Sequence, residues 1–362
     1  DCYLIPHSDE FSNEFLPPYS RRLEWISGFT GSAGEIIITN KKAYLFVDGR
    51  YTIQASQEVD RNHYKILNYK NKSVLDLLSK VMKNQNVIGF DGNIEKFKKI
   101  EILQKKLGKD IKLKPVNSNL IDLIWKNRPK KLISSPFKLP LNFHGEQKSI
   151  KIKKIIRQIK TSKKDACILT SCDTICWLFN IRAQDLEYSP LIMAKSIIHR
   201  DGSCFIFSDQ KTLKNETLNS KIKIIYKPLH HYDSHFNDYK DSIRSYLCAP
   251  NEISFNAVML IKKIGAKVIF KDNIVDILKA KKNTTEENGM RNAHIRDGVA
   301  LTKFIYWIKN TKNNSQTEIS ASNYLDKLRS KNENFFSLSF PTIAGSGPNG
   351  AIVHYRASNK TN

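Results

Sequence analysis

The sequence of 362 residues predicts an α/β fold with mixed sheets, arranged as two similar domains followed by the beginning of a third. Strand-like and helix-like segments alternate from Cys2 to Phe270, and the order of segments in the first half recurs in the second. A polar connector then precedes a long amphipathic helical pattern. Hydrophobic content of 40% and charged content of 26% are ordinary for a globular protein and exclude global disorder.

The first domain is predicted to span residues 1–133. Short apolar runs bounded by turn residues predict its strands, at residues 2–5, 35–39, 43–47, 63–67 and 87–90. Apolar spacing predicts its helices, at residues 51–59, 73–82, 94–107 and 120–125. The two strands on either side of Asn40 and Lys41 predict a hairpin, so the sheet should contain antiparallel as well as parallel pairs.

A proline-containing linker at residues 134–145 separates this domain from the second, which is predicted to span residues 146–278. The same criteria predict its strands at residues 166–169, 194–198, 204–207, 222–226 and 268–270. Helices are expected at residues 146–160, 173–179, 239–247 and 257–264. The similar length and order of the two halves indicate a duplicated domain.

The third part, residues 279–362, begins with a helix whose start is marked by a capping box of Thr284 and Glu287. A second helix is expected at residues 319–328. The glycine-rich segment 337–356 follows, and its apolar runs at 340–344 and 351–353 predict two strands around a tight turn. His354 would then project from a strand end beside this turn, which makes it a candidate catalytic histidine.

Gly345, Gly347 and Gly350 match the spacing of a dinucleotide-binding fingerprint. That motif requires a helix after the turn and an acidic residue about 20 positions further on. Pro348 and the β-branched residues after the turn argue against a helix, and no acidic residue follows. A nucleotide site is therefore not expected here.

Charge, apolar run length and cysteine content indicate which partners and which cellular compartment to expect. The 59 Lys and Arg residues against 35 acidic residues give a net charge of +24, but the lysines are scattered on solvated faces, so no nucleic acid partner is expected. No apolar run reaches the length of about 18 residues that a membrane span needs, so no membrane partner is expected. Six cysteines without a C-x-x-C pair favour a reducing, cytoplasmic setting.

Four ordered stretches closely resemble the X-prolyl aminopeptidases, also called aminopeptidase P, of the long eukaryotic cytosolic type. The last of them is Leu338-Ser-Phe-Pro-Thr-Ile with Gly347-Pro-Asn-Gly-Ala-Ile-Val-His-Tyr. The other three are Gly28-Phe-Thr-Gly-Ser-Ala-Gly34 with Val47-Asp-Gly-Arg-Tyr51, Trp177-Leu-Phe-Asn-Ile-Arg182 with Tyr188-Ser-Pro190, and Glu286 to Leu301. The resemblance implies two tandem creatinase/prolidase N-terminal-type domains followed by the start of a pita-bread catalytic domain.

The resemblance also implies an activity: release of the N-terminal residue from peptides with proline in second position, by a hydroxide that bridges two metal ions, usually manganese. Such a site suits a tertiary X-Pro amide, which lacks an N–H group for strand-like recognition. The family's ligands, two Asp, one His and two Glu, lie downstream of the segment that ends in His354. The chain begins without Met and offers no carboxylate side chain after His354, so it is expected to be incomplete and to lack the metal site.

Two residues match functional positions of the family. His354 matches a substrate-contacting histidine, for which the resemblance implies a role in holding the scissile peptide and stabilising its tetrahedral intermediate. Arg50 matches an arginine that reaches toward the peptide in eukaryotic members. A guanidinium suits peptide carbonyls or a carboxylate, although Arg50 could instead be a hairpin-end residue paired with Asp48.

Two other segments contain residue types that occur in metal or nucleophile sites. His231, Asp233 and His235 could chelate a transition metal, but their crowded placement after Pro228 favours a structural or solvent-exposed role. Ser32 lacks the G-x-S-x-G frame of a nucleophile, and a glycine-supported turn between packed elements explains it.

The leading interpretation is therefore an incomplete aminopeptidase P that acts on Xaa-Pro peptides, is a homodimer and works in the cytoplasm, with a vacuolar or organellar pool left open. The alternative is a non-catalytic pita-bread module that binds peptides or histones. Basic histones prefer acidic partners, and the full motif around His354 argues for the enzyme. Prolidases and creatine-type hydrolases share the catalytic fold, but the long N-terminal part fits them poorly.

Overall fold

The structure is a computed structural model that describes residues 1–362 except 72, 83–85, 220, 312–315 and 360–362. The chain divides into two compact units. The first unit contains residues 1–139 and 146–281, and the second contains residues 140–145 and 282–362. Within the first unit, the part that carries the six-stranded sheet is called domain I, and the part that carries the seven-stranded sheet is called domain II.

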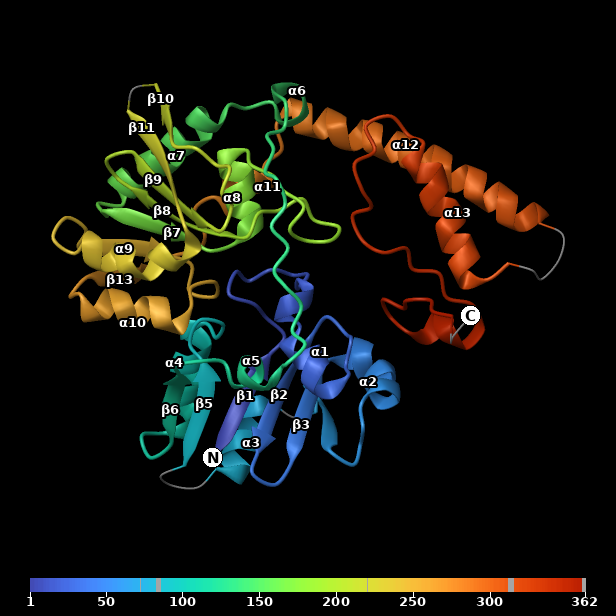
Figure 1. Ribbon diagram of the computed structural model, residues 1–362, viewed down its shortest axis with the longest axis horizontal. Coiled ribbons are helices and arrows are strands. Elements are labelled where there is room, and N and C mark those ends of the chain that lie inside the picture. The colour runs from blue at the N-terminus through green and yellow to red at the C-terminus, as the bar shows by residue number, and fades with distance from the viewer. Residues whose placement is uncertain (72, 83–85, 220, 312–315, 360–362) are drawn as a thin grey trace. The chain divides into compact units, whose positions relative to one another are not determined.

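Domain I is built on a mixed sheet with the strand order β4-β3-β2-β1-β5-β6 (Figure 1). Its strands are β1 (Cys2–Pro6), β2 (Gly34–Thr39), β3 (Ala43–Val47), β4 (Tyr64–Asn68), β5 (Val87–Asp91) and β6 (Lys112–Val116). The predicted hairpin is confirmed, because β2 and β3 pair antiparallel with Ile38 opposite Ala43. The mixed sheet is confirmed as well, since β1 pairs antiparallel with β2 and parallel with β5.

Helices cover both faces of this sheet. They are α1 (Arg22–Ser27), α2 (Thr52–Glu58), α3 (Val74–Val81), α4 (Phe97–Leu107) and α5 (Leu120–Ile124). Side chains of β1 alternate between two cores: Leu4 packs with α3 and α4, whereas Tyr3 and Ile5 pack on the opposite face. A strand that is buried on both faces reads as a continuous apolar run, which is why β1 could be predicted from Cys2 to Ile5.

Domain II repeats this topology in the strand order β10-β11-β9-β8-β7-β12-β13. Its strands are β7 (Ala166–Leu169), β8 (Ala194–His199), β9 (Ser203–Ser208), β10 (Glu216–Leu218), β11 (Ile222–Lys227), β12 (Ser245–Cys248) and β13 (Lys267–Phe270). Each neighbouring pair from β11 to β13 has the same relative direction as its counterpart from β4 to β6. The inferred duplication is therefore confirmed, and β10 is an addition at one edge of the second copy.

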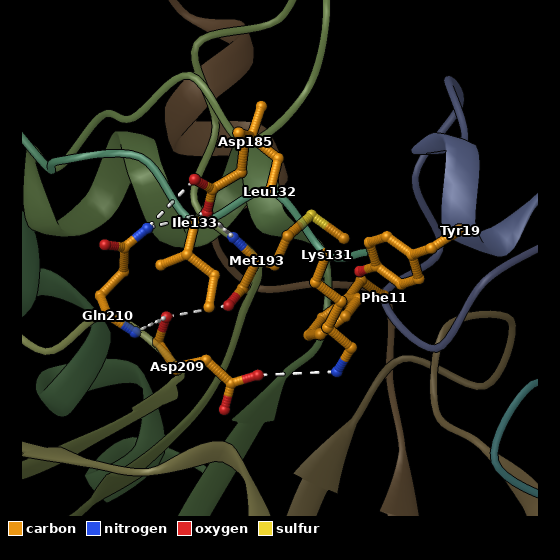
Figure 2. Close-up of a pocket in the computed structure, with 10 residues that line it drawn as sticks. Phe11, Tyr19, Lys131, Leu132, Ile133, Asp185, Met193, Asp209 and Gln210 are labelled. Carbon is orange, nitrogen blue, oxygen red and sulfur yellow. Dashed lines mark hydrogen bonds and ion pairs between the residues drawn. The ribbon is translucent and has the colours of Figure 1, made fainter. Parts of the chain in front are cut away.

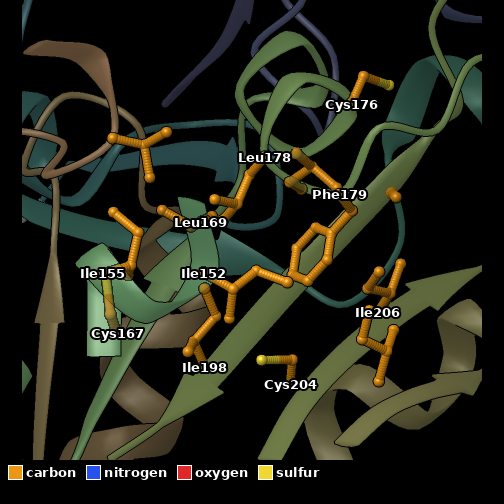
Figure 3. Packing of buried hydrophobic residues seen from close by; sticks show 14 of the residues in the cluster. Ile152, Ile155, Cys167, Leu169, Cys176, Leu178, Phe179, Ile198, Cys204 and Ile206 are labelled. Atoms are coloured by element: carbon orange, nitrogen blue, oxygen red, sulfur yellow. The ribbon is translucent and has the colours of Figure 1, made fainter. Parts of the chain in front are cut away.

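Helices also cover both faces of the second sheet. They are α7 (Lys148–Thr161), α8 (Cys172–Phe179), α9 (Tyr232–Asp238), α10 (Phe255–Lys263) and α11 (Asp276–Ala280). Apolar residues of α7 and α8 form one core with the sheet, as Figure 3 shows for Ile152, Phe179 and their neighbours. All six cysteines of the chain are buried and carry free thiols.

The helix predicted at residues 239–247 is wrong. The helix in this region is α9, which ends at Asp238, and the apolar run Ser245–Cys248 is the strand β12. Four buried residues are too few to distinguish a helical period from a strand. The segment forms a strand instead of a helix because it pairs parallel with both β7 and β13.

The two domains of the first unit dock through an aromatic cluster. The ring of Phe97 in α4 stacks on Phe255 and Phe270 of domain II, with ring centroids 5.9 and 5.5 Å apart. Phe255 also meets Phe90 edge to face at 5.1 Å. Main-chain bonds reinforce this contact, since the amide of Phe97 donates to the carbonyl of Ile253 at 3.1 Å.

Replacing Phe97 by alanine is expected to lower the free energy of unfolding of the first unit by about 3 kcal/mol, because it leaves a cavity beside the rings of Phe255 and Phe270. Chemical denaturation of the variant would measure the loss. Ile102→Ala on the same helix is the matched control, because its side chain is 42% exposed. Equal stability of the two variants would show that the aromatic contact contributes little.

The second unit contains α6 (Leu141–His144), α12 (Thr284–Asn310) and α13 (Glu318–Ser330), and α12 and α13 pack together (Figure 1). The predicted capping box is displaced by one residue, because Asn283 and Glu286 form it instead of Thr284 and Glu287. Oδ1 of Asn283 accepts a hydrogen bond from the amide of Glu286, and Nδ2 of Asn283 donates to the carbonyl of His144 at 2.9 Å. Asn283 is a better N-cap than the predicted Thr284, because its side-chain amide makes both of these bonds.

The end of α6 requires a glycine. Gly145 has a positive φ of 71°, a backbone conformation that L residues rarely adopt. A Cβ atom here would lie 2.6 Å from Oδ1 of Asn283 and 2.8 Å from Cβ of Thr285. The short helix α6 and the start of α12 can therefore meet only if this residue has no side chain.

Candidate functional site

The glycine-rich segment 337–356 does not form the two predicted strands. Among the described residues it contains only a 3-10 helix, η4 (Gly347–Ala351), in place of the tight turn. The strands predicted at 340–344 and 351–353 are therefore wrong for this structure. A strand needs a pairing partner, and local apolar character cannot supply one.

The segment is held to the start of α13 by one carboxylate. Oε1 of Glu318 accepts bonds from the amide of Ser346 at 2.6 Å and from Nδ2 of Asn349 at 3.0 Å. Oε2 accepts bonds from the hydroxyl of Tyr355 at 2.6 Å and from Asn349 at 3.2 Å. The Tyr355 and Ser346 bonds lower the pKa of Glu318, so the carboxylate stays charged at neutral pH.

A second contact joins the segment to α13 further along the helix. The hydroxyl of Thr342 donates to Oδ1 of Asp326 at 2.7 Å. Glu318 and Asp326 lie eight positions apart, about two helical turns. The segment is thus tied to the helix at two points rather than at one.

His354 is exposed, and its backbone has a φ of 55°, in the left-handed region. This conformation costs a non-glycine residue roughly 1–2 kcal/mol and persists where neighbouring contacts enforce it. The next residue, Tyr355, is only 5% exposed and carries the bond to Glu318. The predicted strand-end placement is wrong, but the imidazole is presented to solvent directly beside a buried, hydrogen-bonded anchor.

Arg50 lies in the 3-10 helix η2 (Gly49–Tyr51) of domain I, after strand β3. Its guanidinium forms a bidentate pair with Asp48, with Nε 3.1 Å from Oδ1 and Nη2 2.6 Å from Oδ2. The bond to Asp48 raises the pKa of Arg50. The side chain is 53% exposed and lies over the Tyr51 ring at 5.2 Å, so it is both paired and accessible.

Ser32 is part of a packed turn. Its hydroxyl shares a hydrogen bond of 2.6 Å with the Tyr51 hydroxyl. A Cβ atom on the preceding Gly31 would lie 2.2 Å from the ring of Phe29. Close packing explains the glycines of this turn, as predicted, and Ser32 has a structural partner.

The histidine-rich segment after Pro228 does not bring three ligands together. His235 is 1% exposed, and its Nε2 lies 3.1 Å from Nε2 of His199, a partner that no sequence motif indicates. His231, by contrast, is exposed. Within the described part of the chain, no group of three or more His, Cys, Asp or Glu side chains could hold a metal ion.

The first unit contains a small cavity, shown in Figure 2, between Phe11 and Tyr19 of domain I and Asp185 and Met193 of domain II. Its volume of about 10 Å³ is enough for roughly one water molecule. Asp185 is satisfied there by Nε2 of Gln210 at 2.9 Å. The cavity is too small for a peptide and belongs to the packing of the two domains.

Family comparisons cover the chain from end to end. The Creatinase/Prolidase N-terminal domain matches residues 1–124 and, as a second model with the same description, residues 127–286. Metallopeptidase family M24 matches residues 288–362. The order of these matches is the order implied by the resemblance of the sequence motifs.

Curated relatives named probable Xaa-Pro aminopeptidase P match over almost the whole chain. The protein of Laccaria bicolor is 34% identical over 369 residues, which cover 98% of this chain and 56% of the relative. That of Paracoccidioides brasiliensis is 32% identical over 383 residues, which cover 99% of this chain and 61% of the relative. The chain therefore spans a little over half the length of these relatives.

A solved structure agrees with the sequence comparisons. The X-prolyl aminopeptidase from Caenorhabditis elegans, described as a cytosolic enzyme with a di-nuclear active site, superimposes with a TM-score of 0.92 at 28% identity. The match covers 100% of this chain and 60% of that protein. With two creatinase/prolidase N-terminal domains and the first part of an M24 metallopeptidase domain, the chain belongs to the X-prolyl aminopeptidase family.

Proposed function

We propose that the intact protein is a metalloaminopeptidase that releases the N-terminal residue from peptides with proline in second position. The observation that carries the proposal is the similarity of the entire chain, in fold and in sequence, to X-prolyl aminopeptidases. The 362 residues supply the two N-terminal domains and the first helices of the M24 domain. The activity itself is therefore a property proposed for the whole protein.

The described residues do not fit a metal centre, since none of their His, Cys, Asp and Glu side chains gather in threes. The proposed cofactor, two manganese ions per subunit, is assigned to M24 residues beyond Asn362. Such a centre would supply an activated water and a Lewis acid when bound. The residues of this chain contribute to binding and orienting the peptide.

His354 is proposed as the catalytic and substrate-binding residue of this chain. Its exposed imidazole directly precedes the Tyr355 anchor in sequence, and an N–H group there can donate to the oxygen of the scissile peptide. A donor fixed in advance stabilises the negative charge that develops on this oxygen in the transition state. The tether to α13 restricts where that donor can lie.

Arg50 is proposed as a substrate-binding residue. Arg50→Ala in the intact protein is expected to raise KM for a Xaa-Pro tripeptide by roughly tenfold and to change kcat little, because the guanidinium contacts the peptide away from the reacting bond. Steady-state kinetics would measure the split. Arg61→Ala, which removes an exposed cation of the same domain, is the control. Unchanged KM would assign Arg50 to its pair with Asp48 alone.

The proposed activity can be tested with a matched pair of peptides, Ala-Pro-Ala and Ala-Ala-Ala, in buffer containing manganese. The intact protein is expected to release alanine from the first peptide and to leave the second nearly untouched. The 362-residue chain alone is expected to release nothing and to bind no manganese stoichiometrically in calorimetry. Hydrolysis of neither peptide by the manganese-loaded intact protein would refute the proposal.

A homodimer in the cytoplasm is proposed as the working form of the intact protein. The solved relative is described as cytosolic. Among the described residues, no helix combines the length and apolar composition that crossing a bilayer would require. Light scattering coupled to size-exclusion chromatography would measure the mass of the intact protein in solution.

A further inference from the structure

Both carboxylate oxygens of Glu318 accept hydrogen bonds from a single segment of the chain. Glu318 accepts four bonds from three residues, all of which lie between Gly345 and Arg356. Its side chain belongs to a residue that is only 9% exposed. A helix start needs a cap but not this carboxylate, because Thr317 already caps α13 with its own side chain.

The bonds to Glu318 lie on both sides of His354 in the sequence. The donors Ser346 and Asn349 precede the histidine, and Tyr355 follows it directly. The backbone between these points includes the left-handed residue His354 itself. Anchors on both sides can hold such a residue in a conformation that it would rarely adopt in a free loop.

We infer that Glu318 is a positioning residue: its charged carboxylate fixes the segment around His354 and thereby the direction of the imidazole. The inference rests on the proposed function for its catalytic meaning. The tether itself is independent of that function. Nothing in the chemistry requires Glu318 to touch the peptide, because all its described bonds go to the segment.

The substitution Glu318→Gln separates this role from simple packing. An amide of the same shape has one acceptor oxygen in place of two, so it cannot accept from Ser346, Asn349 and Tyr355 in the same way. The expected result in the intact protein is a fall in kcat for Ala-Pro-Ala of roughly tenfold or more, with KM changed by less than about threefold. Tyr355→Phe, which keeps the buried ring and removes one donor, is expected to give a smaller fall in kcat.

Two comparisons show whether the effect passes through His354. In a His354→Ala background, Glu318→Gln is expected to cost less than about twofold, because the group that it positions is already absent. The double variant Glu318→Gln/Asn349→Asp restores an amide and a carboxylate with their positions exchanged, and it is expected to recover part of the lost kcat. An equal loss of kcat in the wild-type and His354→Ala backgrounds would overturn the inference.

Hydrogen exchange gives a readout that needs no activity. The Ser346 amide is expected to exchange at least about tenfold faster in Glu318→Gln than in the wild type, because its acceptor is weakened. Glu333→Gln, which removes an exposed carboxylate beyond the end of α13, is the matched control and is expected to leave this rate unchanged. Unchanged exchange in Glu318→Gln would overturn the tether. If the wild type does not cleave Xaa-Pro peptides, the proposed function fails while exchange at Ser346 still decides the tether.

Discussion

Replacing His354 by alanine in the intact protein is expected to lower kcat/KM for Ala-Pro-Ala by roughly 10²–10³-fold, the usual cost of removing one donor to a developing oxyanion. The loss should fall mainly on kcat, because the bond strengthens as charge develops on the carbonyl oxygen. Steady-state kinetics with manganese in excess would measure it. The free energy of unfolding should hardly change, since the imidazole is exposed.

Two further variants sharpen this prediction. His354→Gln retains an N–H donor and is expected to recover part of the lost activity, whereas His231→Ala removes another exposed histidine and should leave kinetics unchanged. A His354→Ala protein with wild-type kcat/KM would remove this residue from the mechanism. It would also remove the catalytic meaning of the Glu318 tether.

Acid is expected to destabilise domain II through the buried pair His199 and His235. Burial lowers the pKa of His199 to about 4 and that of His235 to about 3, from an ordinary value of 6.5. Below pH 6.5 the two imidazoles bind protons in the unfolded chain, whereas in the folded domain they stay neutral until the pH approaches their lowered pKa values. The stability contributed by the neutral pair is therefore complete above this pH and is lost as the pH falls toward 4 and then 3.

For these two pKa values, the free energy of unfolding should be about 4 kcal/mol lower at pH 5 than at pH 8. The pair cannot share a hydrogen bond once both rings are protonated, since their Nε2 atoms are 3.1 Å apart. Asp201 favours the charged form of His199, whereas Lys227 disfavours that of His235. Tyr239 stacks on His235 and meets His199 edge to face. It is neutral throughout this range, and burial raises its pKa further above its ordinary value.

Denaturation curves at several pH values would measure this dependence. The double variant His199→Phe/His235→Phe places apolar rings among Phe205, Phe207 and Tyr239 and should lose the pH-dependent difference between pH 8 and pH 5. His63→Ala, an exposed histidine, is the control. The same slope in the double variant as in the wild type would assign the acid sensitivity to carboxylates elsewhere.

Elements with a strong local signal could be predicted from the sequence. β1, β2 and β3 are runs of β-branched, aromatic and other apolar residues between turns, and α10 shows helical spacing of its apolar side chains. β6 was missed because Lys112, Lys114 and Pro115 make this edge strand read as a polar loop. Its assignment depends on pairing with β5, which no local pattern contains.

In the candidate site, too, residues within local motifs could be predicted from the sequence, whereas contacts between distant segments could not. His354 and Arg50 could be named from motifs, and their functional roles stay predictions. The Glu318 tether joins residues 28 to 37 positions apart, and the His199–His235 pair joins residues 36 positions apart. The sequence around Glu318 indicates only a helix start. Contacts between distant segments arise from tertiary packing, so a single sequence read locally has no signal for them.

The division of the chain into units has a practical consequence for dissecting the molecule. Residues 140–145 belong with the M24 part, although domain II lies between them and α12 in sequence. A cut at residue 281 would separate α6 from α12. Asn283, the N-cap residue of α12, donates a hydrogen bond to the carbonyl of His144 in α6. Any two-piece expression of this protein therefore splits a folded unit, and only co-expression of both pieces would let that unit reassemble.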